Sequence, residues 1–118
     1  MRVLAFEDHY DIEAILDAGG VQTDELVIEQ RWNSGDALDW IRRFAPDVLL
    51  LDHFMPPKTG YEVLNALLRA DIPRPSRIVA MSSASEKNHA MVALGADEGV
   101  VKFDLASLPF WPKTTGEI

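Results

Sequence analysis

A single stretch decides the fold of this chain: Pro46-Asp47-Val48-Leu49-Leu50-Leu51-Asp52. Its four consecutive apolar residues have the length of a strand, and the lack of polar alternation indicates that both faces of that strand are covered. Such strands lie in parallel sheets between two layers of helices. The aspartate that follows the run is then expected at the carboxyl end of a buried strand.

The rest of the chain repeats this pattern of a short apolar run followed by a segment with helical spacing. Further strands are expected at Val3–Phe6, Leu26–Ile28, Ile78–Met81 and Val100–Val101. Apolar residues at helical spacing lie between the strands: Ile12, Ile15 and Leu16; Ala37, Leu38, Ile41 and Phe44; Leu64, Leu67 and Leu68; Ala90, Val92, Ala93 and Leu94. Five β/α units, and therefore an α/β fold, follow from this alternation.

Turn-forming residues agree with these units. Helices are expected to begin or end near Gly19-Gly20, Asn33-Ser34-Gly35, Pro56-Pro57 and Gly60, and Ser85 is the expected N-cap of the fourth helix. Pro109 and Pro112 interrupt the segment after Leu105, so the sequence predicts a fifth helix that is short or broken.

Size and composition favour one domain over residues 1–118, with 47% apolar residues and no cysteine. With 19 acidic and 11 basic residues the formal charge is −8, which leaves no phosphate-neutralising surface and argues against direct nucleic-acid binding. No apolar run reaches the roughly 18–20 residues of a membrane helix. A cytoplasmic protein without membrane association is therefore expected.

Four of the five strands are predicted to end at the same edge in groups that bear chemistry, namely Glu7-Asp8, Asp52, Ser82-Ser83 and Lys102. In an open parallel sheet, ligands bind beyond the carboxyl ends of the strands. Carboxylates gathered there repel one another and favour a hard cation such as Mg²⁺. An aspartate can attack phosphorus while a lysine and a hydroxyl bind the transferring oxygens. Each residue alone is an ordinary turn or surface group, but their convergence predicts metal-assisted phosphoryl chemistry.

At this point the sequence resembles the receiver domains of two-component response regulators. Val3–Asp8 resembles the first strand of that family with its acidic pair, and Pro46–Asp52 resembles its phosphoacceptor strand. The pattern continues through Met55-Pro56, the stretch Gly60-Tyr61-Glu62-Val63-Leu64, and Gly95-Ala96-Asp97. The resemblance covers residues 1–104, and residues 105–118 form an atypical proline-containing segment.

The resemblance implies a flavodoxin-like, doubly wound sheet of five parallel strands in the order 2-1-3-4-5, with helices on both faces. It implies that Asp52 is the phosphoacceptor and that Glu7, Asp8, Asp52 and the backbone carbonyl of Phe54 hold Mg²⁺, with Mn²⁺ as an alternative and Glu7 acting largely through water. Lys102 and a switch hydroxyl bind the phosphoryl group. Ser82 fits the family order better than its alternative, Ser83.

The implied partners are a histidine kinase or phosphotransfer protein as phosphodonor and a downstream protein that receives the signal.

The chain is not expected to be an enzyme that turns over an independent substrate. A phosphatase with an aspartyl nucleophile is disfavoured because Phe54 stands where such enzymes need a second aspartate. The histidines beside the acidic residues, His9 and His53, could recruit a transition metal, but a role as ordinary loop residues is favoured.

Several positions depart from the family pattern. Phe103 replaces the usual proline after the lysine, Gly99 stands where an aromatic normally reports phosphorylation, and the segment from Ser82 to Lys102 is about two residues short. These departures favour an alternative function as a phosphorylation-independent interaction module. At the positions that modulate the lifetime of the phosphorylated state, Phe54 and Ala84 cannot orient water. Phe110 and Trp111 are expected to pack back onto the domain.

Overall fold

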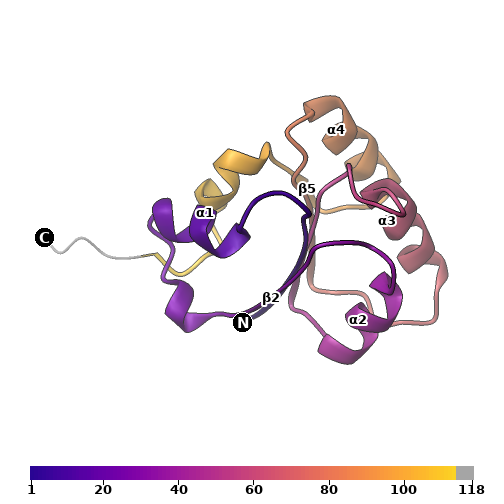
Figure 1. Cartoon of the computed structure of the whole chain (residues 1–118), viewed down its shortest axis with the longest axis horizontal. Coiled ribbons are helices and arrows are strands. Elements are labelled where there is room, and N and C mark those ends of the chain that lie inside the picture. The colour runs from indigo at the N-terminus through magenta and orange to yellow at the C-terminus, as the bar shows by residue number, and fades with distance from the viewer. Residues whose placement is uncertain (114–118) are drawn as a thin grey trace, which may run out of the picture.

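Five parallel strands form the centre of the structure, a computed structural model in which residues 1–113 are described. The sheet has the order β2-β1-β3-β4-β5 (Figure 1). The strands are β1 (Arg2–Phe6), β2 (Val27–Arg31), β3 (Val48–Leu51), β4 (Arg77–Ala80) and β5 (Glu98–Gly99). Every neighbouring pair is parallel, so the predicted fold class and strand order are confirmed.

Helices cover both faces of the sheet, as expected. The α-helices are α1 (Ile12–Ala18), α2 (Ala37–Phe44), α3 (Gly60–Arg69) and α4 (Ser85–Leu94), and two 3₁₀ helices are η1 (Thr23–Glu25) and η2 (Lys102–Ser107). Figure 1 shows α1 with η2 on one side of the sheet and α2, α3 and α4 on the other. No helix among residues 1–113 is long and apolar enough to cross a membrane.

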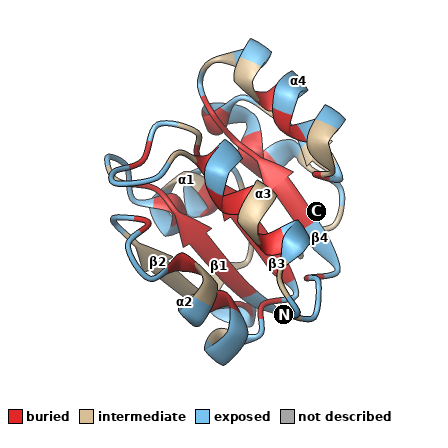
Figure 2. Cartoon of the chain, turned by 90° about the vertical axis from the view of Figure 1, so that its right-hand side faces the viewer, coloured by how far each residue is buried: buried red, intermediate tan, exposed pale blue. Residues whose placement is uncertain are grey.

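Two apolar clusters hold the layers together, one on each face of the sheet. Along β3, Leu49 and Leu51 pack with α2, α3 and α4, whereas Val48 and Leu50 pack with α1 and η2. All four residues of β3 are buried (Figure 2), and its bounds are those predicted from the sequence. Side chains on a strand alternate between faces, so one continuous apolar run supplies both layers.

Some predicted boundaries were wrong. The fifth strand is Glu98–Gly99, two residues before the predicted Val100–Val101. Val100 still donates its N–H to the Ala80 carbonyl (2.9 Å), but the chain then leaves the sheet to enter η2. Of the two valines, Val100 packs partly buried against the α1-side cluster, whereas Val101 is exposed.

The predicted N-cap of the fourth helix was also wrong by one residue, because Ser85 is the first residue of α4 and Ala84 is its N-cap. The Ala84 N–H donates a hydrogen bond to the hydroxyl oxygen of Ser82, at 3.1 Å. This bond fixes the residue before the helix, and no side chain among the described residues caps the first turn of α4.

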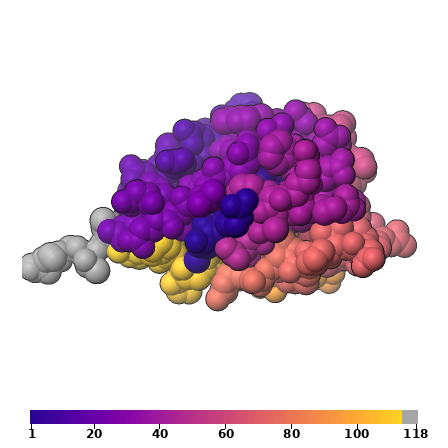
Figure 3. Space-filling view, turned by 90° about the horizontal axis from the view of Figure 1, so that it is seen from below, coloured from indigo at the N-terminus to yellow at the C-terminus, as the bar shows by residue number. Residues whose placement is uncertain are grey.

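The C-terminal segment confirms the prediction of a short fifth helix. The 3₁₀ helix η2 ends at Ser107, and the following segment lies against α1 and η1. Trp111 is buried and donates its indole N–H to the Leu105 carbonyl (3.0 Å), while the Gln22 N–H bonds the Pro112 carbonyl (2.8 Å). Figure 3 shows this segment in yellow beside the indigo and purple N-terminal part. Residues 114–118 lie outside the described part.

Replacing Trp111 by alanine should lower the free energy of unfolding by roughly 3–5 kcal/mol, because a buried aromatic and its hydrogen bond are lost together. Urea unfolding followed by circular dichroism measures the change. The matched control is Trp32→Ala, since that side chain is 50% exposed. A loss for Trp111→Ala no larger than for Trp32→Ala would show that the C-terminal segment does not seal the α1 face.

Candidate phosphoryl-transfer site

Three carboxylates meet at the carboxyl edge of the sheet. Glu7 and Asp8 follow β1, Asp52 follows β3, and these strands are neighbours with Phe6 opposite Leu51. One oxygen from each of the three side chains lies within 4.8 Å of the others. The parallel register therefore brings together the acidic residues that the sequence places at two strand ends.

Glu7 organises the loop after β1. Its side chain is fully buried, and its Oε2 accepts hydrogen bonds from the backbone N–H groups of His9 (2.9 Å) and Tyr10 (3.1 Å). Its Oε1 lies 2.7 Å from Nζ of Lys102 in an ion pair. Both oxygens therefore already have neighbours, and the role of Glu7 at the metal through water stays a prediction.

Lys102 lies between two carboxylates. Its ammonium group is buried, 2.7 Å from Glu7 Oε1 and 3.6 Å from Asp52 Oδ1. It also lies 5.3 Å from the centre of the Tyr10 ring, whose edge-to-face partner at 5.1 Å is Phe103. Phe103, the residue after the lysine, thus packs against the ring that lies beside the Lys102 ammonium. Nothing in the sequence pattern pointed to Tyr10, which reaches Lys102 only through the fold.

The structure raises the pKa of Asp52 above the ordinary value for an aspartate. Burial raises its pKa to about 6, the Lys102 ammonium opposes that shift, and the Glu7 carboxylate adds to it. Its Oδ1 is buried and has no hydrogen-bond partner among the described residues. An aspartate with this pKa is largely ionised at neutral pH, and an ionised oxygen that accepts no hydrogen bond is the state that a nucleophile needs.

The raised pKa predicts that metal-free protein loses stability as pH rises. Below about pH 4 both folded and unfolded Asp52 are protonated, whereas between the two pKa values only the folded state keeps the proton. Asp52→Asn in EDTA should therefore gain stability over wild type from about pH 4 to 7, reaching about 1–3 kcal/mol. Urea titrations at several pH values measure it. A pH-independent difference would contradict a raised pKa.

A glycine lets the next helix lie close to Asp52. The Gly60 N–H donates to the His53 carbonyl (2.9 Å), and a Cβ at this position would overlap the Asp52 carbonyl oxygen. The Thr59–Glu62 capping box starts α3 at this point. The Gly60 of the sequence motif is therefore required by close packing beneath Asp52.

The two serines after β4 have different surroundings. Ser82 is fully buried and its hydroxyl bonds the Ala84 amide, whereas Ser83 is exposed and lines a hollow of about 350 Å³. The same hollow is lined by Asp8, His9, Tyr10, Asp52, Phe54 and Lys102. This lining favours Ser83 as the hydroxyl at the site, while the sequence order favours Ser82.

Phe54 stands at the rim of the hollow, with its side chain 53% exposed and its ring edge-to-face with His53 at 4.9 Å. Ala84 is not among the residues that line the hollow. The role of the Phe54 carbonyl as a metal ligand stays a prediction.

The carboxylates suit a hard divalent cation, because their donors are all oxygen and Asp52 Oδ1 has no hydrogen-bond partner. The cluster contains neither of the neighbouring histidines, His9 and His53, among the residues that the structure describes. Their rings contact Tyr10 and Phe54 instead. The role of both histidines as ordinary loop residues stays a prediction.

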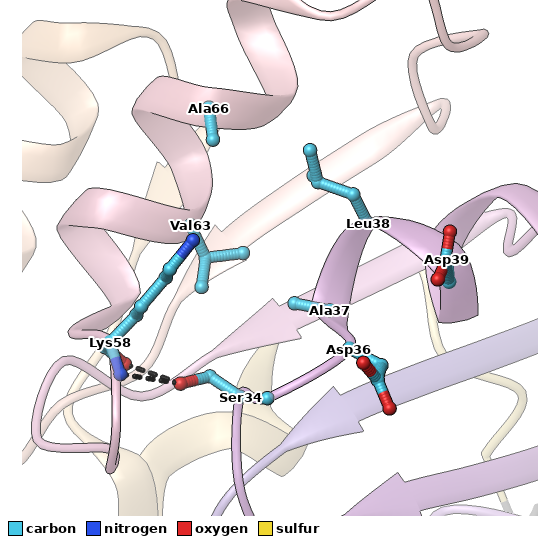
Figure 4. Close-up of a pocket in the computed structure, with 9 residues that line it drawn as sticks. Ser34, Asp36, Ala37, Leu38, Asp39, Lys58, Val63 and Ala66 are labelled. Atoms are coloured by element: carbon cyan, nitrogen blue, oxygen red, sulfur yellow. Dashed lines mark hydrogen bonds between the residues drawn. The ribbon is translucent and has the colours of Figure 1, made fainter.

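A second hollow, of about 180 Å³, lies between the start of α2 and α3 (Figure 4). Its buried hydroxyl, that of Ser34, already exchanges hydrogen bonds with the Lys58 backbone at 2.7 and 2.8 Å. The acids on its wall, Asp36 and Asp39, are exposed. This hollow lacks the convergent, buried charges that distinguish the edge of the sheet.

Comparison with known proteins finds a family match over most of the chain. A sequence model of the response regulator receiver domain matches residues 3–106. The transcriptional regulatory protein PrrA of Mycobacterium leprae is 31% identical over 108 residues, which cover 91% of this chain and 46% of that protein. The nitrate/nitrite response regulator protein NarP of Escherichia coli is 33% identical over 76 residues, covering 64% of this chain and 35% of that protein. The chain spans 24–46% of the length of such curated relatives.

Solved receiver domains share the fold. The receiver domain of a DNA-binding response regulator from Colwellia psychrerythraea superposes with a TM-score of 0.70 at 23% identity, covering 93% of this chain and 89% of that chain. The response regulator TrrA of Thermotoga maritima, solved in complex with Mg²⁺ and BeF, superposes with a TM-score of 0.64 at 26% identity, covering 86% of this chain and 85% of that chain.

Proposed function

Because this chain belongs to the response regulator receiver family, we propose that it accepts a phosphoryl group on Asp52 and signals to a protein partner by a change of conformation. The observation that carries the proposal is the buried carboxylate of Asp52, whose Oδ1 accepts no hydrogen bond from the described residues and lies 3.6 Å from the Lys102 ammonium. The donor is a histidine kinase or a phosphotransfer protein, and the reaction is cytoplasmic. The chain itself turns over no independent substrate and contacts neither nucleic acid nor membrane.

The chemistry follows from these positions. An oxygen of ionised Asp52 attacks phosphorus and forms the new P–O bond, while the bond from phosphorus to the donor nitrogen breaks and its electron pair stays on the imidazole. Charge on the transferring oxygens is met by the ammonium of Lys102 and by a serine hydroxyl, with Ser82 and Ser83 as the two candidates. Excluding water from these buried groups strengthens each interaction.

We assign the metal to Asp8 and Asp52 as direct carboxylate ligands, with the Phe54 carbonyl beside them and Glu7 acting through water. Bound Mg²⁺, or Mn²⁺ in its place, supplies positive charge against the carboxylates and the incoming phosphoryl oxygens. Support comes from the three oxygens within 4.8 Å and from the TrrA relative that was solved with Mg²⁺.

The direct test is the intact mass of the protein after incubation with acetyl phosphate and Mg²⁺. Wild type should gain one phosphoryl group, and Asp52→Asn or wild type in EDTA should gain none. A phosphoryl group on the Asp52→Asn protein would show that the phosphoacceptor is another residue. Absence of modification in wild type would overturn the proposed function.

The alternative of a phosphorylation-independent module can be tested at the same site. Lys102 lies closer to Glu7 (2.7 Å) than to Asp52 (3.6 Å), so its charge is already engaged. Beryllofluoride with Mg²⁺ mimics the phosphorylated aspartate and separates the two functions. Unchanged NMR shifts around Asp52 on adding both would favour the module, whereas shifts in the Asp52 and Ser83 loops would favour phosphorylation.

Spontaneous loss of the phosphoryl group should be slow, because the Phe54 ring at the rim cannot orient a water molecule and Ala84 cannot either. Phe54→Asn should accelerate hydrolysis by about tenfold or more, since an amide there can position the attacking water. Decay of the phosphorylated mass after donor removal, with Mg²⁺ retained, measures the rate. Phe54→Leu is the matched control that opens space without a polar group, and equal acceleration in both variants would contradict water positioning.

A further inference from the structure

A buried asparagine joins three elements near the site. Asn88 lies in α4, is 2% exposed, and uses its whole amide. Its Oδ1 accepts the Ser82 N–H (2.8 Å), and its Nδ2 donates to the carbonyls of Ser82 (2.9 Å) and Val100 (3.0 Å). One acceptor and both donors are therefore satisfied, which makes this a complete buried polar network.

This network connects the two segments that carry the phosphate-side groups. Ser82 begins the loop that presents Ser83 to the hollow, and Val100 lies two residues before Lys102. The far side of the loop is held as well, since the Ser82 hydroxyl bonds the Ala84 amide. A serine loop and the chain that leads to Lys102 are thus fixed to the same side chain.

Close packing leaves this arrangement little room to change. Helix α4 lies directly beside β5 (Figure 1). A Cβ at Gly99 would lie 3.1 Å from Asn88 Cβ and 3.3 Å from Val92 Cγ2. Loss of the amide would remove this partner from the buried N–H and carbonyl of Ser82 and from the partly buried carbonyl of Val100, and unpaired buried backbone groups are costly. The loop and the chain before Lys102 are held to α4 as one unit.

We propose, on the basis of the phosphoryl transfer proposed above, that Asn88 is a positioning residue for that reaction. It holds the serine loop and the chain before Lys102 in one arrangement, so that hydroxyl and ammonium reach the phosphoryl oxygens on Asp52 together. Asn88 itself touches neither the reacting atoms nor the carboxylates that would hold the metal. Its effect is therefore on the rate of phosphoryl transfer and not on the affinity for Mg²⁺.

The test compares Asn88→Ala and Asn88→Asp with Val92→Ala, which trims the same α4–β5 contact without touching the loop. Asn88→Asp keeps the shape and the acceptor for the Ser82 N–H, but it loses both donors and sets a carboxylate against two carbonyls. Both Asn88 variants should be phosphorylated by acetyl phosphate about tenfold to a hundredfold more slowly, because small misplacements of reacting groups cost that much. Their Kd for Mg²⁺ should stay within about twofold of wild type, since no ligand is altered.

Each outcome has a separate meaning. If wild type is phosphorylated and folded Asn88 variants match its rate, or Val92→Ala slows as much as they do, the positioning role is overturned. If wild type is not phosphorylated at all, the proposed function fails first. Hydrogen exchange of the wild-type protein gives a test that does not depend on the folding of a variant. The Ser82 N–H should exchange as slowly as the backbone N–H groups of β4, and exchange at the rate of an open loop would overturn the proposal.

Discussion

Substituting Asp8 by alanine should abolish both Mg²⁺ binding and phosphorylation of Asp52. Asp8 is partly exposed at the mouth of the hollow and contributes one of three oxygens that lie within 4.8 Å. Glu7 is engaged by Lys102 and by two backbone N–H groups. Loss of Asp8 therefore leaves Asp52 as the remaining direct carboxylate ligand. Mg²⁺ dehydrates reluctantly, so one carboxylate holds it poorly.

We expect the Kd for Mg²⁺ to rise by at least about tenfold, since even the partners of metal ligands are worth 10–100-fold. Isothermal titration gives the affinity, and intact mass after acetyl phosphate gives the modification. Asp36→Ala is the matched control, because that acid is exposed in the second hollow, away from the site. Metal-dependent phosphorylation that survives in Asp8→Ala would place the metal elsewhere.

Lys102→Ala should have the opposite effect on Mg²⁺ while also blocking phosphoryl transfer. The ammonium is the cation that contacts both Glu7 and Asp52, at 2.7 and 3.6 Å. Removing it takes away a positive charge that disfavours the metal, so Mg²⁺ should bind as well as in wild type or more tightly. Phosphorylation should slow by about a hundredfold or more, because a buried group that stabilises transition-state charge is lost.

The same change should lower the stability of metal-free protein by roughly 3–5 kcal/mol, since it leaves a buried carboxylate without its partner. Added Mg²⁺ should then raise the unfolding temperature of Lys102→Ala more than that of wild type. Titration calorimetry, thermal unfolding and intact mass measure the three effects. Lys58→Ala, exposed beside the second hollow, is the control. Weakened Mg²⁺ binding in folded Lys102→Ala would argue against a lysine on the phosphate side.

Local sequence determined the parts of this fold that depend on one strand or one helix at a time. The run Val48–Leu51 is buried on both faces and ends in Asp52, as its unbroken apolar character predicts. The prolines after Leu105 limit the last helix to a 3₁₀ segment. Parallel strands share one edge, so the meeting of Glu7, Asp8 and Asp52 also followed from the sequence.

Tertiary structure decided the features that depend on packing between elements. The sequence order favours Ser82, yet the loop buries its hydroxyl against Ala84 and turns Ser83 to the hollow. Asn88 lies on α4 three residues before Met91, and both side chains are buried. The local sequence does not show whether a polar residue at this spacing faces the core or the solvent. Its proposed role depends on the backbone carbonyls of Ser82 and Val100, which follow two different strands. Such partners come together only when the chain has folded.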